Sequence, residues 1–254
     1  MLWAISNGAR IKPTPDTKAA CPICKSELIS KCGSIKKWHW SHKNLQDCDD
    51  WSEGETDWHI DWKNEFKDDW QEVAIKNHRA DIYNPHKMLV IELQNSTISA
   101  DEIIEREQFY GNMIWVINGD TLGKNIILNY NKDKGIITFR WKFPPKSWWA
   151  ADKPIYVDFT DCNEKLVDEL NSYLIDGKKY YENVSSLEEN DYGDGEHWET
   201  YAEDFTQNRI NKLNKTIDLR IGNLILLKKI HHKTPCYGWA TKISKEDFIK
   251  QYGS

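Results

Sequence analysis

The chain has 254 residues, enough for one mid-sized domain with an appendage or for two small domains. Hydrophobic residues make up 39% and charged residues 29%, which is typical of a globular protein and excludes a disordered or fibrous one. No long apolar run is present, and the N-terminal stretch MLWAISNGAR lacks the basic-then-apolar pattern of a signal peptide. We therefore expect a cytoplasmic protein with no membrane partner.

The net charge of −6 argues against a nucleic-acid partner, but the charge is unevenly distributed. Residues 47–72 hold 11 acidic residues against two lysines, whereas residues 209–250 hold 10 basic residues against three acidic ones. An acidic front suits bound cations and a basic tail suits phosphates. Two solvated faces of opposite sign explain the same pattern equally well.

The first motif in the chain is a cysteine knuckle, Cys21-Pro-Ile-Cys24, followed by the sequence WHWSH and by Cys48. In a cytoplasmic protein this spacing indicates a metal site rather than a disulfide. Zinc takes four sulfur or nitrogen ligands in a tetrahedron. We therefore predict a structural Zn²⁺ site formed by Cys21, Cys24, His42 and Cys48.

The fourth zinc ligand is open at this stage. His42 is preferred because it lies nearer the turn that leads to Cys48, but His39 or Cys32 could replace it. A redox pair or reduced core thiols are the alternatives to a metal site.

A helix is predicted over residues 53–70. Aromatic residues recur at every fourth position and predict one apolar stripe: Trp58, Trp62, Phe66 and Trp70. Glu55, His59 and Lys63 recur one position out of phase and form a polar ridge that could lean into a cleft. The alternative is a solvated ladder of i,i+4 pairs.

Three strands are predicted next, over residues 71–76, 78–83 and 88–94, followed by a helix over 99–110 and a strand over 113–118. Ser99 and Glu102 form a capping box at the start of this helix. The order is therefore helix, three strands, helix, strand.

An acid interrupts the apolar run MLVIELQ, where it is costly unless it is paired or bound to a metal. This acid, Glu92, shares a strand face with Gln94, and the neighbouring strand can bring Asp81 alongside. Two converging carboxylates form a hard-oxygen site suited to Mg²⁺ or Mn²⁺. Glu72, at the start of a strand, is a candidate additional ligand.

The signal weakens in the C-terminal half. We expect a hairpin over residues 125–130 and 136–142, a strand over 154–159, a helix over 163–174 and an exposed acidic loop over 185–195. Trp148 and Trp149 could stack on bases, but packing against the sheet is the favoured interpretation. A basic tail follows that could track a phosphate backbone, with Lys228, Lys229, His231, His232 and Lys233.

The order of elements, with the pattern D-x(10)-E-x-Q, resembles the PD-(D/E)XK nuclease fold. The succession CPIC, HWSH, ETDWHIDWK, HRADIY, IELQNSTIS and EREQFYGNMIWV is similar to the competence protein CoiA-like family over roughly residues 1–118. The resemblance implies an α/β fold with a mixed sheet, in which a restriction-endonuclease-like core (51–160) follows a zinc-ribbon-like module (1–50) and precedes a helical, basic region (161–254).

The resemblance also implies roles for individual residues. Asp81 and Glu92 match the metal-binding acids, while Gln94 stands where the superfamily often has lysine. Glu55, His59 and Lys63 match the first-helix pattern of the family, and we infer that Lys63 supplies the missing cation. Basic residues that would contact the nucleic acid are Arg79 and Arg106.

Taken together, the sequence predicts a metal-dependent deoxyribonuclease that hydrolyses DNA phosphodiester bonds in uptake, recombination or defence. The alternative is a catalytically inactive nucleic-acid-binding protein that retains the nuclease fold. A protein-interaction adaptor is a further rival. The sequence does not separate DNA from RNA as substrate, and it leaves a homodimer as one candidate assembly.

Overall fold

The computed structural model describes residues 1–44, 48–49, 51, 54–123, 125–131, 135–141, 145–160, 219–220, 222–231 and 236–254. The chain divides into two compact units. The first comprises Met1–Leu122, Pro145–Tyr156 and Glu246–Ser254, and the second comprises Gly123–Pro144 and Val157–Lys245. The helix predicted over 163–174, the loop predicted over 185–195, and His232 and Lys233 lie outside the described residues.

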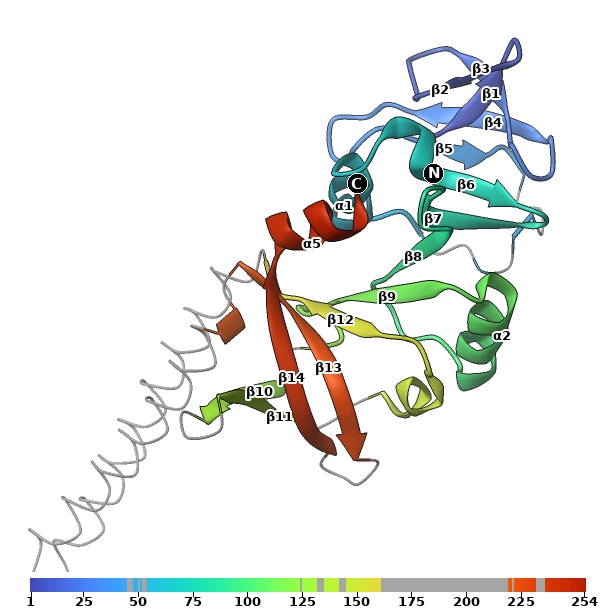
Figure 1. Cartoon of the computed structure of the whole chain (residues 1–254). Helices are drawn as coiled ribbons and strands as arrows, with labels where there is room; N and C mark the ends of the chain where they lie inside the picture. Colours follow the sequence, from blue (N-terminus) through green and yellow to red (C-terminus); the bar gives the residue numbers. More distant parts are fainter. Residues whose placement is uncertain are drawn as a thin grey trace, which may run out of the picture. The chain divides into compact units, whose positions relative to one another are not determined.

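The first unit begins with a five-stranded sheet in the order β2-β1-β3-β4-β5 (Figure 1). Its antiparallel strands are β1 (Ala4–Ser6), β2 (Ala9–Ile11), β3 (Lys18–Ala20), β4 (Glu27–Lys31) and β5 (His39–His42). Strand β4 buries Leu28 and exposes its neighbours, as the two-residue period of a strand requires. Leu28 and Trp40 lie in the small apolar core of this sheet.

A mixed sheet forms the core of the first unit, with β12 (Ile155–Asp158), β9 (Met113–Asn118), β8 (Leu89–Gln94), β7 (His78–Asn84) and β6 (Gln71–Ile75) in that order. Strands β6, β7 and β8 pair antiparallel, whereas β8 and β9 are parallel and are joined through helix α2 (Ala100–Tyr110). Every residue of β8 is buried, which explains its nearly unbroken apolar sequence. The predicted mixed α/β fold and its element order are confirmed.

The long helix predicted over residues 53–70 is wrong in its bounds. Helix α1 spans only Asp57–Asn64, and a separate 3-10 turn, η1, spans Asp68–Trp70. The side chain of Thr56 caps the start of α1, so Glu55 precedes the helix. Acidic residues follow the helix, where the negative end of the helix dipole disfavours them: Glu65, Asp68 and Asp69.

Helix α2 begins as predicted, because Ser99 Oγ accepts a hydrogen bond from the Glu102 amide at 3.0 Å. It ends at Gly111, whose φ of +68° is readily adopted only by glycine. The last helix, α5 (Lys245–Tyr252), packs Phe248 edge-on against Trp62 of α1. Within the described part of the chain, no helix is long and apolar enough to cross a membrane.

The second unit contains an antiparallel sheet in the order β10-β11-β14-β13. Its strands are β10 (Ile126–Asn131), β11 (Ile136–Trp141), β13 (Asn223–His231) and β14 (Cys236–Ser244). The hairpin predicted around residues 131–135 is therefore confirmed.

In the first unit, Trp148 of the short 3-10 helix η2 (Lys146–Ala150) is buried edge-on against Trp115. This packing confirms the interpretation favoured for Trp148 from the sequence.

Candidate functional site

Four metal-ligating side chains meet at one end of the N-terminal sheet. The ligand atoms of Cys21, Cys24, His42 and Cys48 all lie within 4.8 Å of one another. Cys21 and Cys24 come from the turn between β3 and β4, in which Lys25 adopts a φ of +62° and donates its amide to the Cys21 carbonyl at 3.1 Å. These four side chains could hold a metal ion such as zinc.

The two alternative zinc ligands lie elsewhere. His39 directs Nδ1 to the carbonyl oxygen of Lys37 at 2.9 Å, and Cys32 is not part of the group that the described residues form. Burial and the neighbouring cysteines raise the pKa of the Cys48 thiol to about 12. Burial acts in the same direction on Cys24, but hydrogen bonds, chiefly with Ser26, lower the pKa of that thiol to about 6. Cations that bind this group must displace the remaining protons.

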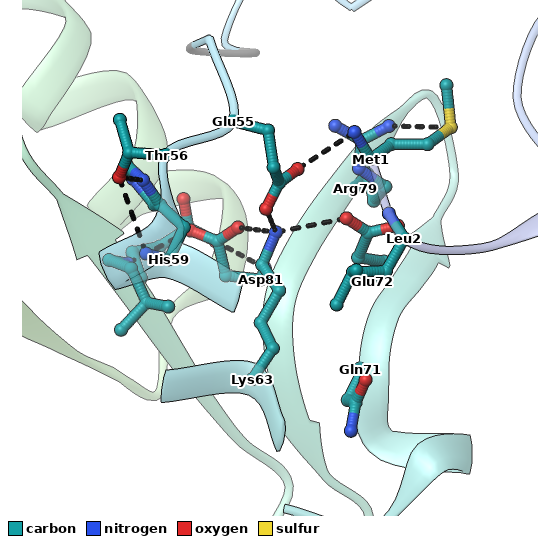
Figure 2. Close-up of polar contacts among 12 residues, drawn as sticks. Met1, Leu2, Glu55, Thr56, His59, Lys63, Gln71, Glu72, Arg79 and Asp81 are labelled. Atoms are coloured by element: carbon teal, nitrogen blue, oxygen red, sulfur yellow. Dashed lines mark hydrogen bonds and ion pairs between the residues drawn. The ribbon is translucent and has the colours of Figure 1, made fainter. Parts of the chain in front are cut away.

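A buried lysine organises the acidic residues of the core (Figure 2). Lys63 is only 1% exposed, and its Nζ lies 2.8 Å from Glu55, 3.0 Å from Glu72 and 3.1 Å from Asp81. Burial alone would lower the pKa of Lys63, but the three carboxylates outweigh it and raise that pKa. Lys63 is therefore a permanent cation.

Glu72 and Glu55 tie the start of the chain to this lysine. Glu72 accepts hydrogen bonds from the amides of Leu2 and Trp3 at 2.8 and 3.0 Å, and Glu55 lies 2.9 Å from the amino group of Met1 (Figure 2). Glu72 adopts a φ of +47°, a conformation that costs a non-glycine residue roughly 1 kcal/mol or more. Its three charge-assisted contacts offset that strain.

Asp81 and Glu92 form a pair across strands β7 and β8. Ile82 of β7 pairs with Ile91 of β8 in antiparallel register, so Asp81, just before Ile82, lies opposite Glu92, just after Ile91. Glu92 Oε1 accepts the Asp81 amide at 3.2 Å, and Asp81 Oδ2 accepts the Leu93 amide at 3.0 Å. The structure thus brings the two acids together in the sheet, as the sequence predicts.

The two acids have opposite pKa shifts. Burial, followed by the charge of Asp81, raises the pKa of Glu92 to about 8. Burial also acts to raise the pKa of Asp81, but Lys63 outweighs it and holds that pKa below its usual value. In the absence of a metal, the pair therefore carries one negative charge near neutral pH.

Arg106 of α2 is ion-paired within this site. Its Nη1 donates to Glu92 Oε2 at 2.9 Å, while Nη2 donates to Glu102 and to the carbonyl oxygen of Trp51. The guanidinium is buried, and its Nε has no hydrogen-bond partner among the described residues. Arg106 thus holds the Glu92 side chain from the helix side.

A cavity of about 30 Å³ adjoins these groups. Its polar lining comes from both the sheet and the helices: Glu55, His59, Lys63, Arg79, Asp81, Glu92 and Arg106. These seven are the residues predicted for the acidic site and for the nucleic-acid contact, apart from Gln94.

His59 and Gln94 differ in their relation to this cavity. The His59 ring lines it and is positioned by Thr56 Oγ1 at 2.7 Å from Nδ1. Gln94 lies beyond the lining: it is completely buried, and its amide donates to the Ser96 carbonyl at 3.1 Å. Gln94 Oε1 has no hydrogen-bond partner among the described residues.

Sequence reasoning missed the residues that connect the cysteine group to the acidic site. Asp49 is buried and accepts hydrogen bonds from His78 Nδ1 and from the Arg79 amide, both at 2.9 Å. Trp51 stacks on His78 with ring centroids 3.4 Å apart. The acidic run before Trp51 carries a signal, but as an acidic front it indicates bound cations or a solvated face and not a buried contact with β7.

Two models of known protein families match the chain. Residues 14–50 match the N-terminal domain of competence protein CoiA. Residues 71–144 match its nuclease-like domain, a range that contains Asp81, Glu92, Gln94 and Arg106.

These two matches support a CoiA-like competence protein family for this chain. The match to the nuclease-like domain supports a nuclease-related role in competence and suggests an interaction with nucleic acid. Glu55, His59 and Lys63 lie between the two matched ranges, so their place in the site comes from the structure alone. The chain has no significant match among curated proteins or among solved structures.

Proposed function

We propose that this CoiA-like protein is a metal-dependent deoxyribonuclease whose Asp81 and Glu92 bind Mg²⁺ or Mn²⁺. The observation that carries the proposal is the Asp81–Glu92 pair, which faces a charged cavity beside the buried Lys63. The nuclease-like domain match supports the same chemistry. The proposed setting is DNA uptake, recombination or defence. The proposed domains are a zinc-ribbon-like module at residues 1–50, a nuclease core at 51–160 and a helical, basic region at 161–254.

The donor set fits a hard divalent cation. Carboxylate oxygens are the ligands that Mg²⁺ and Mn²⁺ prefer, and the cavity of about 30 Å³ admits a small ion with a water. Such a cation lowers the pKa of its bound water and neutralises charge on the scissile phosphate. The Cys21, Cys24, His42 and Cys48 group fits Zn²⁺, with a structural role because all four positions are filled by protein.

Lys63 supports this chemistry as a fixed cation. Because its pKa is raised, it stays protonated and cannot act as a general base. Its contact with Asp81 keeps that carboxylate ionised and able to bind a cation. Lys63 thus supplies, from helix α1, the positive charge that the superfamily often places at position 94.

The remaining site residues have supporting roles. His59 is held by Thr56 at the cavity wall, where an imidazole is suited to proton transfer. Arg106 and Arg79 provide guanidinium groups for a phosphate. Gln94 lies behind the cavity lining, where its amide oxygen without a described partner would act on the site only through neighbouring groups. Glu55 fixes Lys63.

One observation favours the alternative, a catalytically inactive nucleic-acid-binding protein. Arg106 already contacts Glu92 at 2.9 Å, and burial raises the pKa of Glu92 to about 8, so a metal must compete with that contact and displace a proton. Glutamine in place of lysine at position 94 points the same way.

Cleavage of DNA separates the two functions. Wild type and Glu92→Gln are compared on linear and circular DNA, single- and double-stranded, with Mg²⁺ or Mn²⁺. Asp101→Asn is the matched control, because Asp101 is an exposed acid in the first turn of α2. The proposal requires metal-dependent cleavage by wild type and the control, and its loss in Glu92→Gln. DNA binding by wild type without cleavage would establish the inactive alternative.

A further inference from the structure

Cys48, Asp49 and Trp51 contact residues of both the cysteine group and the acidic site. Cys48 Sγ lies 3.4 Å from Cys21 Sγ at the metal-ligating group. The next residue, Asp49, is only 9% exposed although it is charged. A buried carboxylate needs hydrogen-bond donors around it, so the donors to Asp49 show which part of the fold this residue holds in place.

Asp49 fixes the start of strand β7. Its two oxygens accept separate hydrogen bonds, Oδ1 from His78 and Oδ2 from the Arg79 amide. These are the first two residues of β7, and Asp81 lies two residues further along the same strand. The position of Asp49 therefore sets where β7 presents Asp81.

Trp51 extends the connection to Glu92. Its ring stacks on His78 at an interplanar angle of 9°, and its carbonyl oxygen accepts a hydrogen bond from Arg106 Nη2. The Arg106 guanidinium also lies 5.5 Å from the Trp51 ring centroid. Since Nη1 of the same guanidinium donates to Glu92, Trp51 holds the group that orients this acid.

We propose that Asp49 and Trp51 are positioning residues that couple metal loading at the cysteine group to the geometry of the Asp81–Glu92 pair. Asp49 has no regular secondary structure and Trp51 lies in a turn, so neither is held by a strand or helix, and a cation bound to Cys48 anchors both. Loss of that anchor releases Arg106 and the start of β7 together. This inference rests on the proposed function, because it concerns the cation affinity of that acidic pair.

The test uses the full-length, zinc-loaded protein with Asp49→Ala. Zinc content is measured first and should equal that of wild type, since Asp49 is not a ligand. Mn²⁺ affinity is then measured by calorimetry and should fall about tenfold or more, the usual effect of losing a residue that orients metal ligands. Hydrogen exchange should rise in peptides covering β8 and the first turns of α2.

Two further variants separate positioning from general destabilisation. Asp49→Asn keeps an oxygen for the Arg79 amide and should recover part of the Mn²⁺ affinity. Glu27→Gln removes an exposed acid of the same N-terminal sheet, paired with Lys43, and should leave Mn²⁺ affinity unchanged.

The outcomes are distinct. Zinc-loaded Asp49→Ala with wild-type Mn²⁺ affinity and wild-type hydrogen exchange would overturn the coupling. Wild-type protein with no Glu92-dependent Mn²⁺ binding would overturn the proposed function. In that case the exchange measurement alone decides the coupling: increased exchange around Glu92 in Asp49→Ala upholds it, and unchanged exchange refutes it.

Discussion

Replacing Lys63 with methionine removes the ammonium and keeps a side chain of similar length. Three carboxylates that lie 2.8 to 3.1 Å from Nζ then lose their shared partner. Removal of one partner from a buried ion pair costs about 3 to 5 kcal/mol. Because Arg79 and the Met1 amine remain nearby, we expect a loss of about 3 kcal/mol at pH 7.5, which corresponds to a fall in Tm of about 6 to 12 °C.

The loss should depend on pH in a defined direction. Lys63 holds the pKa values of Glu55, Glu72 and Asp81 below their usual range, against the opposing effect of burial. Acids with lowered pKa values stabilise the fold above their unfolded pKa of about 4, and this contribution is lost as pH falls through the folded values. Without Lys63, burial raises these pKa values. The difference between wild type and Lys63→Met should therefore shrink from pH 7.5 to pH 4.

Urea denaturation followed by tryptophan fluorescence at both pH values measures this difference. Lys37→Met is the control, since Lys37 forms a half-exposed ion pair with Asp61 of α1 and should change stability little. A Lys63→Met protein as stable as wild type at pH 7.5 would show that the ammonium group does not stabilise the three carboxylates. So would an equal loss at both pH values, because it would show that charge is not the cause.

Three further predictions concern the metal sites and Gln94. Because the pKa of Glu92 is raised to about 8 by burial and then by Asp81, Mn²⁺ must displace a proton. Calorimetry should therefore show affinity rising by up to about tenfold per pH unit and levelling off above about pH 8. Mn²⁺ affinity that is flat between pH 6.5 and 8.5 would contradict this prediction. The same raised pKa of Glu92 should make the metal-free fold less stable as pH rises from 4.5 to about 8. Gln94→Leu removes a buried oxygen without a described partner, so the free energy of unfolding should change by no more than about 1 kcal/mol. DNA cleavage should fall about tenfold or more. Cleavage at the wild-type rate would show that Gln94 has no role in the reaction. Cys24→Ser should lower the zinc content measured by elemental analysis and Cys32→Ser should not, and equal zinc in both would show that the ligand set is wrong.

Local patterns were sufficient to predict much of the core. Strand β8 was recognisable because a strand buried on both faces needs an apolar run, and an acid within that run stood out at Glu92. The start of α2 was predictable because Ser99 satisfies a helix amide within three residues. The cysteine knuckle was predictable because its ligands are adjacent in sequence.

Contacts between distant residues were beyond such patterns. Glu72 accepts the amide of Leu2, 70 residues away, and its backbone conformation is unusual for glutamate, so its central position was not visible in the sequence. The sequence places Asp49 in an acidic front that suits either bound cations or a solvated face, and its actual partners are 29 and 30 residues further along. The helix over 53–70 was predicted too long because its aromatic spacing continued past the acidic residues that end α1.

Single-turnover cleavage of end-labelled DNA, with Mg²⁺ added to zinc-loaded protein, shows whether the reaction takes place at the Asp81–Glu92 pair. Wild type, Asp81→Asn and the control Asp101→Asn are compared at pH 8. The account predicts cleavage by wild type and Asp101→Asn that stops when Mg²⁺ is omitted, and none by Asp81→Asn. Undiminished cleavage by a folded Asp81→Asn protein would contradict it, because the reaction would then take place away from the Asp81–Glu92 pair.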